Sequence, residues 1–230
     1  MKVGFSGLNL QAGKVKFQDA RLADISAKCA PEKTSFVFIE FVEGEFTGCD
    51  CVVCAEDKKL DLCIPDIEKI ENRLNAAGDE AEKEILKKAL RSLEAETPLK
   101  ESDLSADERA KLQELSLITL KPVVFLADGN LSTDELIKKI LNACGYILFY
   151  TIVKKEVRGW LVEKDSTAVF CAGKIHTDLA RGFIKAEVVS YADFMDAHNI
   201  HDAKAKGKVK LVGKDYIVQD GDILDIKFNV

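Results

Sequence analysis

Hydrophobic residues between positions 2 and 127 gather in short, nearly continuous runs. These runs fall at 2–6, 35–42, 49–55 and 121–127. Such runs are typical of strands that are covered on both faces, as in parallel α/β sheets. The pattern therefore predicts an α/β domain whose first strand leads into a glycine-bounded turn at 7–14.

A different pattern separates the third and fourth of these runs. From residue 65 to about 116 the chain is rich in Glu, Lys, Leu and Ala, and apolar residues recur three and four positions apart. This spacing predicts a long amphipathic helix or a helical hairpin. Pro65 suits the first helical position, and Gly78 marks a bend or a turn. Ser105 and Glu108 have the spacing of a capping box, which predicts a further helix.

The chain changes character again after residue 132. Residues 133–143 have apolar positions on one side and predict a helix. Beyond Gly145 the pattern becomes short strands with turns, and the expected strands lie at 147–153, 156–162, 185–189, 209–211, 216–218 and 223–228. The helical segment thus reads as an insertion into the α/β domain, followed by a strand-rich domain.

Composition narrows the class of protein. The chain has 230 residues, of which 47% are hydrophobic and 31% charged, as in ordinary globular proteins with one or two compact domains. No apolar run is long enough to cross a bilayer, and the first residues are too poor in apolar residues for a signal peptide, so we expect a cytoplasmic protein without membrane contact. A net charge of −6 argues against a protein that coats nucleic acid, and no DNA partner is expected.

Cysteines cluster around the third apolar run. Cys49, Cys51 and Cys54 lie on a predicted strand, with Cys63 beyond it. On a strand Cys49 and Cys51 share one face and Cys54 points to the other, which opposes convergence on a metal ion. Burial in the core is therefore the preferred interpretation, and a metal or redox role is the alternative.

Several ordered motifs resemble one protein family. The segments 155–160, 172–178, 181–188, 213–223 and 228–230 resemble successive signatures of the C-terminal domain of the YchF/Obg-like ATPase family, which belongs to the TRAFAC class of P-loop GTPases. Weaker similarity continues at 121–127, 19–22 and 40–44, which resemble parts of the family's G domain. The resemblance implies a TGS-type β-grasp domain, a helical arm and a G domain that lacks long stretches.

These patterns together define an expected architecture of the α/β plus α+β class. A reduced, P-loop-like α/β domain comprises 1–63 and 117–143. A helical hairpin or coiled coil is inserted at 64–116. A TGS-type β-grasp domain occupies 144–230.

The nucleotide-binding loop implied by the resemblance departs from its consensus. A P-loop needs G-x-x-x-x-G-K-[ST], in which the last hydroxyl binds Mg²⁺. Here five residues separate Gly7 from Gly13-Lys14, and Val15 stands at the metal-binding position. Because Mg²⁺ requires oxygen ligands, Val15 cannot hold it. The sequence therefore predicts loss of hydrolysis, and Mg²⁺ binding is not expected.

Two further motifs of the nucleotide site are altered. The D-x-x-G motif is represented only by Glu43-Gly44, and Asp128 replaces the base-reading asparagine. The residues left as candidates for residual binding of ATP or GTP are Gly7, Asn9, Gly13, Lys14 and Asp128. The alternative is that 7–14 forms only a strand-to-helix turn, with Lys14 in solvent.

A basic segment lies near the C-terminus. Lys204, Lys206, Lys208 and Lys210 alternate, so in an extended chain they project from one face, with Lys214 nearby. They are candidates for contact with RNA phosphates or another partner. The alternative is a strand edge whose lysines only discourage aggregation.

Three functions follow from these observations. The first is a non-catalytic module that binds the ribosome, RNA or another protein, with or without a nucleotide as a structural ligand. The second is an ATP or GTP hydrolase in which Asp19 or Glu43 replaces the missing magnesium ligand. The third is a small-molecule regulatory role on the TGS domain, for which the sequence indicates no pocket residues.

Overall fold

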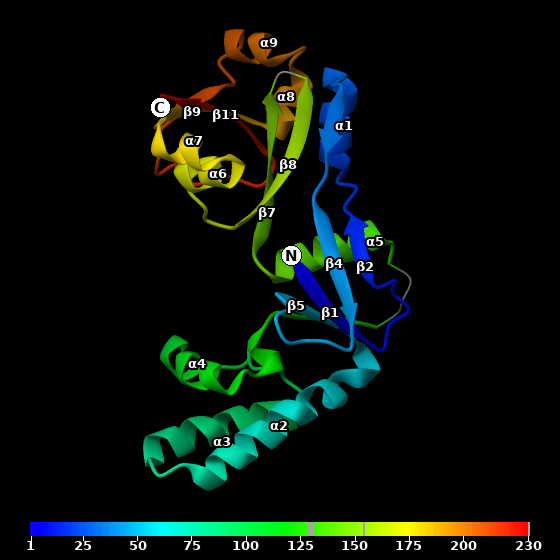
Figure 1. Ribbon diagram of the computed structural model, residues 1–230, viewed down its shortest axis with the longest axis vertical. Helices are drawn as coiled ribbons and strands as arrows, with labels where there is room; N and C mark the ends of the chain where they lie inside the picture. Colours follow the sequence, from blue (N-terminus) through cyan, green and yellow to red (C-terminus); the bar gives the residue numbers. More distant parts are fainter. Residues whose placement is uncertain (128–130, 154, 230) are drawn as a thin grey trace. The chain divides into compact units, whose positions relative to one another are not determined.

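The computed structural model describes residues 1–127, 131–153 and 155–229, and the chain divides into two compact units. Unit 1 consists of Met1–Val15 and Ile39–Cys144, and unit 2 of Lys16–Phe38 and Gly145–Val230. Each unit contains its own sheet (Figure 1). Among the described residues no helix has the length and apolar character of a membrane span.

The sheet of unit 1 has five strands in the order β2-β4-β1-β5-β6. The strands are β1 (Lys2–Ser6), β2 (Gly13–Lys16), β4 (Phe38–Glu43), β5 (Cys51–Ala55) and β6 (Val123–Leu126). The pairs β4–β1, β1–β5 and β5–β6 are parallel. Every residue of β5 is buried, as its continuous apolar run predicts. The predicted α/β character of this part is confirmed, whereas β2 was not predicted.

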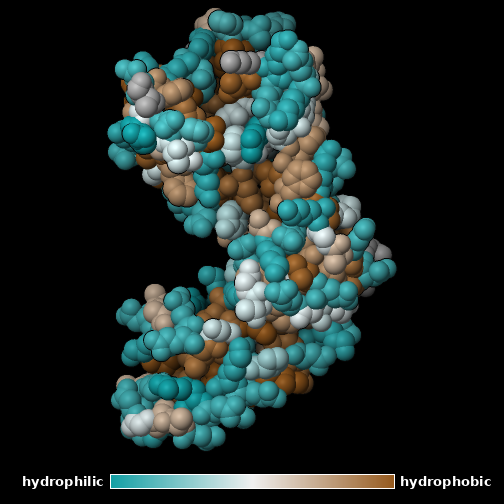
Figure 2. Space-filling view, viewed as in Figure 1, coloured by the Kyte–Doolittle hydropathy of each residue, from teal (hydrophilic) through white to brown (hydrophobic). Residues whose placement is uncertain are grey.

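The inserted segment forms helices α2 (Lys59–Ala76), α3 (Glu80–Glu94) and α4 (Ala106–Leu112), with short 3-10 turns η1 (Glu56–Lys58), η2 (Gln113–Leu115) and η3 (Ile118–Leu120). The predicted hairpin is present, and its apolar stripes meet in one buried cluster that includes Ile70, Leu86 and Leu93. Figure 2 shows hydrophobic surface between α4 and the α2–α3 pair. Gly78 lies in the turn between α2 and α3, where a turn was expected.

The ends of these helices partly match the sequence signals. The capping box is confirmed, because Glu108 N donates to Ser105 Oγ at 3.2 Å and Ser105 N donates to Glu108 Oε2 at 2.6 Å. The assignment of Pro65 to the first helical position is wrong, because α2 already begins at Lys59. Burial of Leu62 and Cys63 holds this first turn in helical form. That packing outweighs the single backbone hydrogen bond that a proline removes.

The sheet of unit 2 has six strands in the order β10-β9-β11-β7-β8-β3. They are β3 (Lys33–Ser35), β7 (Tyr146–Val153), β8 (Glu156–Glu163), β9 (Phe183–Ser190), β10 (Lys210–Val212) and β11 (Asp222–Phe228). Strands β11 and β7 pair in parallel, as do β3 and β8, whereas the other neighbours are antiparallel. The expected strand at 216–218 is wrong, since only an isolated bridge joins Ile217 to Thr167.

Short helices follow or separate these strands. They are α5 (Thr133–Ala143) in unit 1 and α6 (Ala168–Ile175), α7 (Thr177–Arg181), α8 (Tyr191–Asp196) and α9 (Ile200–Ala205) in unit 2. The apolar side predicted for α5 is confirmed, because Leu136, Ile137 and Ile140 are buried. Helix α6 places Cys171 and Ala172 in a core that also contains Phe149 of β7.

A segment from the first part of the chain completes unit 2. Helix α1 (Ala20–Cys29) buries Leu22 and Ile25, and β3 pairs with residues 156–158 of β8. Leu22 lies against Gly159 of β8, where an added Cβ would come within 3.5 Å of its Cδ2. Residues 16–38 therefore belong to unit 2, although the expected domains place them in the α/β part.

Candidate functional site

The carboxyl end of strand β1 lies at the position where open α/β sheets usually bind ligands. The neighbours β4 and β5 pair with β1 on opposite sides, so the crevice beyond β1 and β5 is a topological switch point. Gly7 follows β1 with φ of +70°, and an added Cβ there would lie 3.0 Å from Lys58 Cγ and 3.2 Å from Ala55 Cβ. The loop after β1 therefore packs directly against the chain that follows β5.

Two lysines at this edge of the sheet already have acidic partners. Lys58 pairs with Asp61 at 3.1 Å, and Lys59 pairs with Glu56. At the end of β4, Gly44 N donates to Phe5 O at 2.9 Å. Asn9 is exposed in the loop after β1. Of the expected nucleotide-binding residues, Gly7 and Asn9 thus lie in the loop at this crevice.

Gly13 and Lys14 lie in a different place. After residues 7–12 the chain enters strand β2 rather than a helix, so the expected strand-to-helix turn is wrong. Strand β4 separates β2 from β1, and Lys14 is exposed on this edge strand. A phosphate cradle draws on the free amides at a helix N-terminus, and none follows this loop. The geometry of β2 therefore differs from that of a P-loop.

The remaining parts of the expected nucleotide site are dispersed. Glu43 is exposed at the end of β4, next to Gly44. Asp128 lies outside the described residues. Val15 is half-buried within β2. Within the described part of the chain, no three His, Cys, Asp or Glu side chains come together in a group that could hold a metal ion.

The cysteines near β5 are core residues. Cys49, Cys51, Cys54 and Cys63 are all buried, which confirms the preferred interpretation. Cys54 packs with Val52 in one cluster, and Cys63 packs in the cluster of the hairpin. Burial raises the pKa of the Cys63 thiol to about 11, which keeps this group neutral and unreactive.

The basic segment near the C-terminus does not form an extended array. Lys204 lies in α9, Lys206 caps this helix and Lys210 lies in β10, so the condition of an extended chain is not met. Three of the lysines form ion pairs, namely Lys204 with Glu187 at 2.8 Å, Lys206 with Asp202 at 2.9 Å and Lys208 with Asp193 at 2.9 Å. Lys210 and Lys214 are exposed, and neither is in an ion pair with any described residue.

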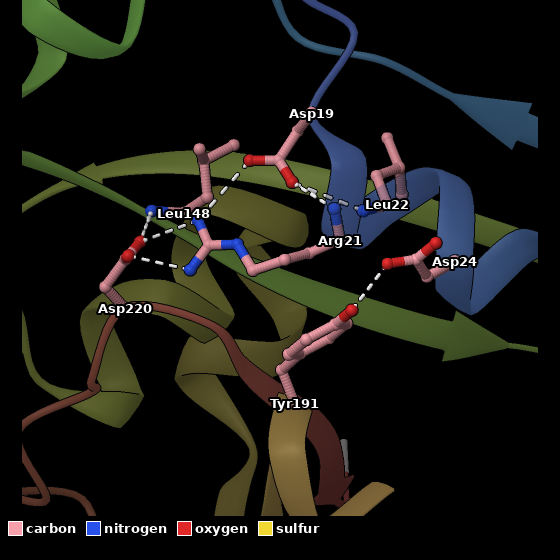
Figure 3. A network of polar contacts seen from close by, with 7 residues as sticks. All are labelled: Asp19, Arg21, Leu22, Asp24, Leu148, Tyr191 and Asp220. Carbon is pink, nitrogen blue, oxygen red and sulfur yellow. Dashed lines mark hydrogen bonds and ion pairs between the residues drawn. The ribbon is translucent and has the colours of Figure 1, made fainter. Parts of the chain in front are cut away.

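A polar network within unit 2 joins the start of α1 to the turn before β11 (Figure 3). Asp19 caps α1 by accepting from Arg21 N at 2.7 Å and from Leu22 N at 3.3 Å. Arg21 donates to both carboxylate oxygens of Asp220, at 2.7 and 3.2 Å, and to Asp19 Oδ2 at 3.3 Å. Asp220 also accepts from Leu148 N of β7 at 2.9 Å.

Arg21 remains charged within this network. Burial opposes the charge on Arg21, but the hydrogen bond to Asp220 and the charge on Asp19 outweigh it and raise the pKa of Arg21. A second link lies close by, where Tyr191 Oη donates to Asp24 Oδ2 at 2.5 Å. Asp19 therefore serves as a helix cap and a salt-bridge partner, and its carboxylate is already engaged.

Sequence reasoning identified both ends of this network as family-like segments, and assigned a role only to Asp19, as a substitute magnesium ligand in the hydrolase alternative. Arg21 and Asp220 are 199 positions apart, so nothing in one sequence indicates that they meet. The local signal was the order Asp19, Ala20, Arg21, in which an aspartate precedes a short apolar-periodic segment.

Comparisons with a family model, with individual proteins and with a solved structure all show similarity to YchF proteins. Residues 146–229 match the family YchF-GTPase_C, described as a protein of unknown function (DUF933). The chain is 29% identical to the ribosome-binding ATPase YchF of Escherichia coli O157:H7 over 270 residues, which span 93% of this chain and 71% of that protein. It is 28% identical to the ribosome-binding ATPase YchF of Bacillus subtilis over 241 residues, which span 76% of this chain and 66% of that protein.

The length of the first alignment shows that part of the difference in size lies within the aligned region. The alignment of 270 residues is longer than the part of this chain that it contains, so the Escherichia coli protein has internal stretches without a counterpart here. The fold is that of the Schizosaccharomyces pombe YchF GTPase, with a TM-score of 0.79 over 99% of this chain and 97% of that chain at 18% identity.

Proposed function

This chain is a shortened relative of the YchF proteins, and we propose that it is a ribosome-binding module that does not hydrolyse nucleotides. Several curated relatives are named ribosome-binding ATPases, which supports the ribosome as partner. Binding to ribosomal RNA or to a ribosomal protein satisfies the proposal equally.

The observation that carries the proposal is the path of the chain after β1. Phosphoryl transfer depends on a helix N-terminus, a lysine and a hydroxyl-bound Mg²⁺ that together hold the phosphates. Here residues 7–12 lead into strand β2, which carries Lys14 next to Val15. The position of the lysine on an edge strand, with no helix N-terminus after the loop and no hydroxyl at position 15, supports binding without hydrolysis.

The topology of unit 2 supports a TGS-type β-grasp domain as the partner-binding element. Two hairpins, β7–β8 and β9–β10, flank the final strand β11, which pairs in parallel with β7. Helices α6 and α7 connect the hairpins. Lys210 and Lys214 in this unit are the lysines left for phosphate contact, because the other three candidates are paired with acids.

A competing function is nucleotide hydrolysis with a substitute metal ligand. Asp19 is unsuited to that role, because its carboxylate caps α1 and pairs with Arg21. Of the two candidate magnesium ligands, this leaves Glu43, which is exposed at the end of β4. In this alternative Gly7 and Asn9 would contact ATP or GTP at the crevice beyond β1.

Two measurements separate these functions. We expect isothermal calorimetry with ATP and GTP to give weak or no heat, unchanged by Mg²⁺, and no release of phosphate. Magnesium-dependent micromolar binding, with turnover that is lost in Lys14→Ala or Glu43→Ala, would establish the hydrolase instead.

Ribosome binding is tested by cosedimentation across a series of salt concentrations. We expect wild-type protein to sediment with ribosomes at low salt and to dissociate steeply as salt rises, since phosphate contacts release counterions. The double variant Lys210→Glu and Lys214→Glu should bind more weakly than a control with the same charge change at two exposed lysines of α5, Lys138→Glu and Lys139→Glu. Failure of wild type to sediment at any salt concentration would refute the proposal.

A further inference from the structure

Unit 2 contains a cavity of about 550 Å³ that has no part in the sites described above. It lies between the end of α1, strands β7, β8, β9 and β11, and helices α8 and α9. Its apolar wall includes Ile152, Val157, Val189, Phe194, Ile223 and Leu224. Figure 2 shows hydrophobic residues in a hollow of unit 2 beneath α9. The volume falls within the range of sites that enclose a small organic molecule.

The acidic groups that line this cavity are neutralised. Each of four carboxylates has a lysine partner: Glu32 with Lys155, Glu156 with Lys33, Glu187 with Lys204, and Asp225 with Lys227. Glu187 has a second partner in Lys227, at 3.3 Å. The pairs leave little net charge on this part of the wall.

Lys28 is the exception among the charged lining residues. Its Nζ donates to the backbone oxygen of Met195 at 2.8 Å and to that of Ala197. An ammonium group has three donors, so one remains after these two bonds. Among the described residues, no carboxylate oxygen lies close enough to Lys28 Nζ, within 4.0 Å, to form an ion pair. The ammonium also lies 5.3 Å from the ring centroid of Phe194, at the apolar wall.

We propose that this cavity binds an amphipathic monocarboxylate, with its apolar body against the wall and its carboxylate on Lys28. A single uncompensated positive charge matches a single negative charge. A dianionic phosphomonoester would bring a second negative charge for which the described lining residues offer no second unpaired lysine, which makes it the poorer ligand. The proposal gives unit 2 a small-molecule site in addition to its proposed role in ribosome binding.

Lys28 also fastens α1 to the end of α8, because its two acceptors lie in the last turn of α8 and just beyond it. A ligand on Lys28 would therefore stabilise the packing of these two helices. This coupling gives a second readout, since any ligand that binds only the folded state raises the melting temperature.

The test uses calorimetry and thermal melting of the full chain with decanoate, decanol and decyl phosphate. We expect saturable binding of one decanoate, weaker binding of decanol and of decyl phosphate, and a larger rise in melting temperature with decanoate than with either of the other two at the same concentration. Lys28→Met, which keeps the length of the side chain and removes its charge, should weaken decanoate binding by about tenfold or more. The matched control is Lys185→Met, an exposed lysine of β9 that does not line the cavity.

A second variant keeps Lys28 and its backbone contacts intact. Val209 lines the cavity, is half-buried and lies outside the helices and strands, so Val209→Trp fills the space with little demand on the fold. We expect Val209→Trp to abolish decanoate binding while the fold is retained. Absence of saturable decanoate binding to wild type, equal binding of decanol, or full binding by a folded Val209→Trp would each overturn the proposal.

Discussion

Arg21 links helix α1 to the turn before β11 through two hydrogen bonds to Asp220, at 2.7 and 3.2 Å. A lysine at position 21 keeps the charge but cannot present the two parallel donors. Because the side chain of Asp220 is 49% exposed, solvent reduces the energy of the pair. We expect Arg21→Lys to lower the free energy of unfolding by about 1 to 2 kcal/mol, measured by urea denaturation.

The coupling itself can be isolated with a double-mutant cycle. Arg21→Lys and Asp220→Asn should cost less together than the sum of their separate effects, because both remove the same interaction. Arg181→Lys is the control, since that side chain is 75% exposed and pairs with Asp178 at 3.5 Å. Additive effects of the two changes would contradict the direct interaction.

Asp222 is a buried carboxylate whose charge is costly. Burial raises its pKa above the ordinary value of 3.8, although hydrogen bonds from Gln219 N and Tyr216 Oη partly oppose the shift. The folded state then holds the proton more tightly than the unfolded state, so stability falls as pH rises from 3.8 through the raised pKa.

The pH dependence is measured against Asp222→Asn. We expect wild type to lose stability relative to this variant as pH increases across that window, and the difference to level off above it. The control is Asp215→Asn, at an exposed position. A wild-type advantage that grows with pH would show that the charged form is the favoured one in the folded state.

At the scale of elements, a buried aspartate joins helix α2 to the turn η3. Asp66 is fully buried and accepts three hydrogen bonds, from Ile118 N and Thr119 N at 2.8 Å each and from Thr119 Oγ1 at 2.7 Å. Asp66→Ala would leave two backbone donors without partners in the core. We expect it to lower the free energy of unfolding by about 3 kcal/mol or more in chemical denaturation.

A second aspartate of the same helix provides the comparison. Asp61 is 63% exposed and pairs with Lys58, three positions before it. We expect Asp61→Ala to change stability by less than about 0.5 kcal/mol, as is usual for exposed pairs on a helix. Equal costs for the two alanine variants would mean that the η3 contact contributes little.

The elements that could be predicted from sequence are those with strong local signals. The buried run of β5, the capping box at Ser105 and the apolar side of α5 all depend on residues close together in the chain. Helix α1 and strand β3 were not predicted, because they are short and are stabilised by distant contacts with β8. Short helices gain most of their stability from such packing.

The candidate site also differs from its prediction where distant contacts, and not local signals, decide the structure. The alternation of lysines suggested an extended face, but Asn199 caps α9 by accepting from His201 N and Asp202 N, so Lys204 is helical. The loop after β1 resembles a P-loop in its glycines, yet pairing with β4 makes residues 13–16 a strand. Such long-range pairing is not visible in the spacing of residues in one sequence.

At the scale of the whole molecule, the chain passes between the two units after Val15, after Phe38 and after Cys144. Unit 2 thus needs a segment that precedes most of unit 1 in the sequence. Phe17 and Leu22 are each 1% exposed and Ile25 is fully buried, so this segment contributes core side chains. Burial of each such side chain stabilises by about 1.5 to 3 kcal/mol, and their sum approaches the stability of an ordinary domain.

This dependence predicts how fragments of the chain behave. A fragment of residues 145–230 should be unstable or aggregate, because it exposes the edge of β8 and the apolar surface that α1 covers. Joining residues 16–38 to it through a flexible linker should restore cooperative unfolding, monitored by circular dichroism and urea denaturation. The same fusion with Leu22→Ala and Ile25→Ala keeps α1 and β3 but loses their buried side chains, so it should resemble the short fragment. If residues 145–230 alone unfold as cooperatively as the fusion, then α1 contributes little to the stability of the sheet, and residues 145–230 fold independently of the rest of the chain.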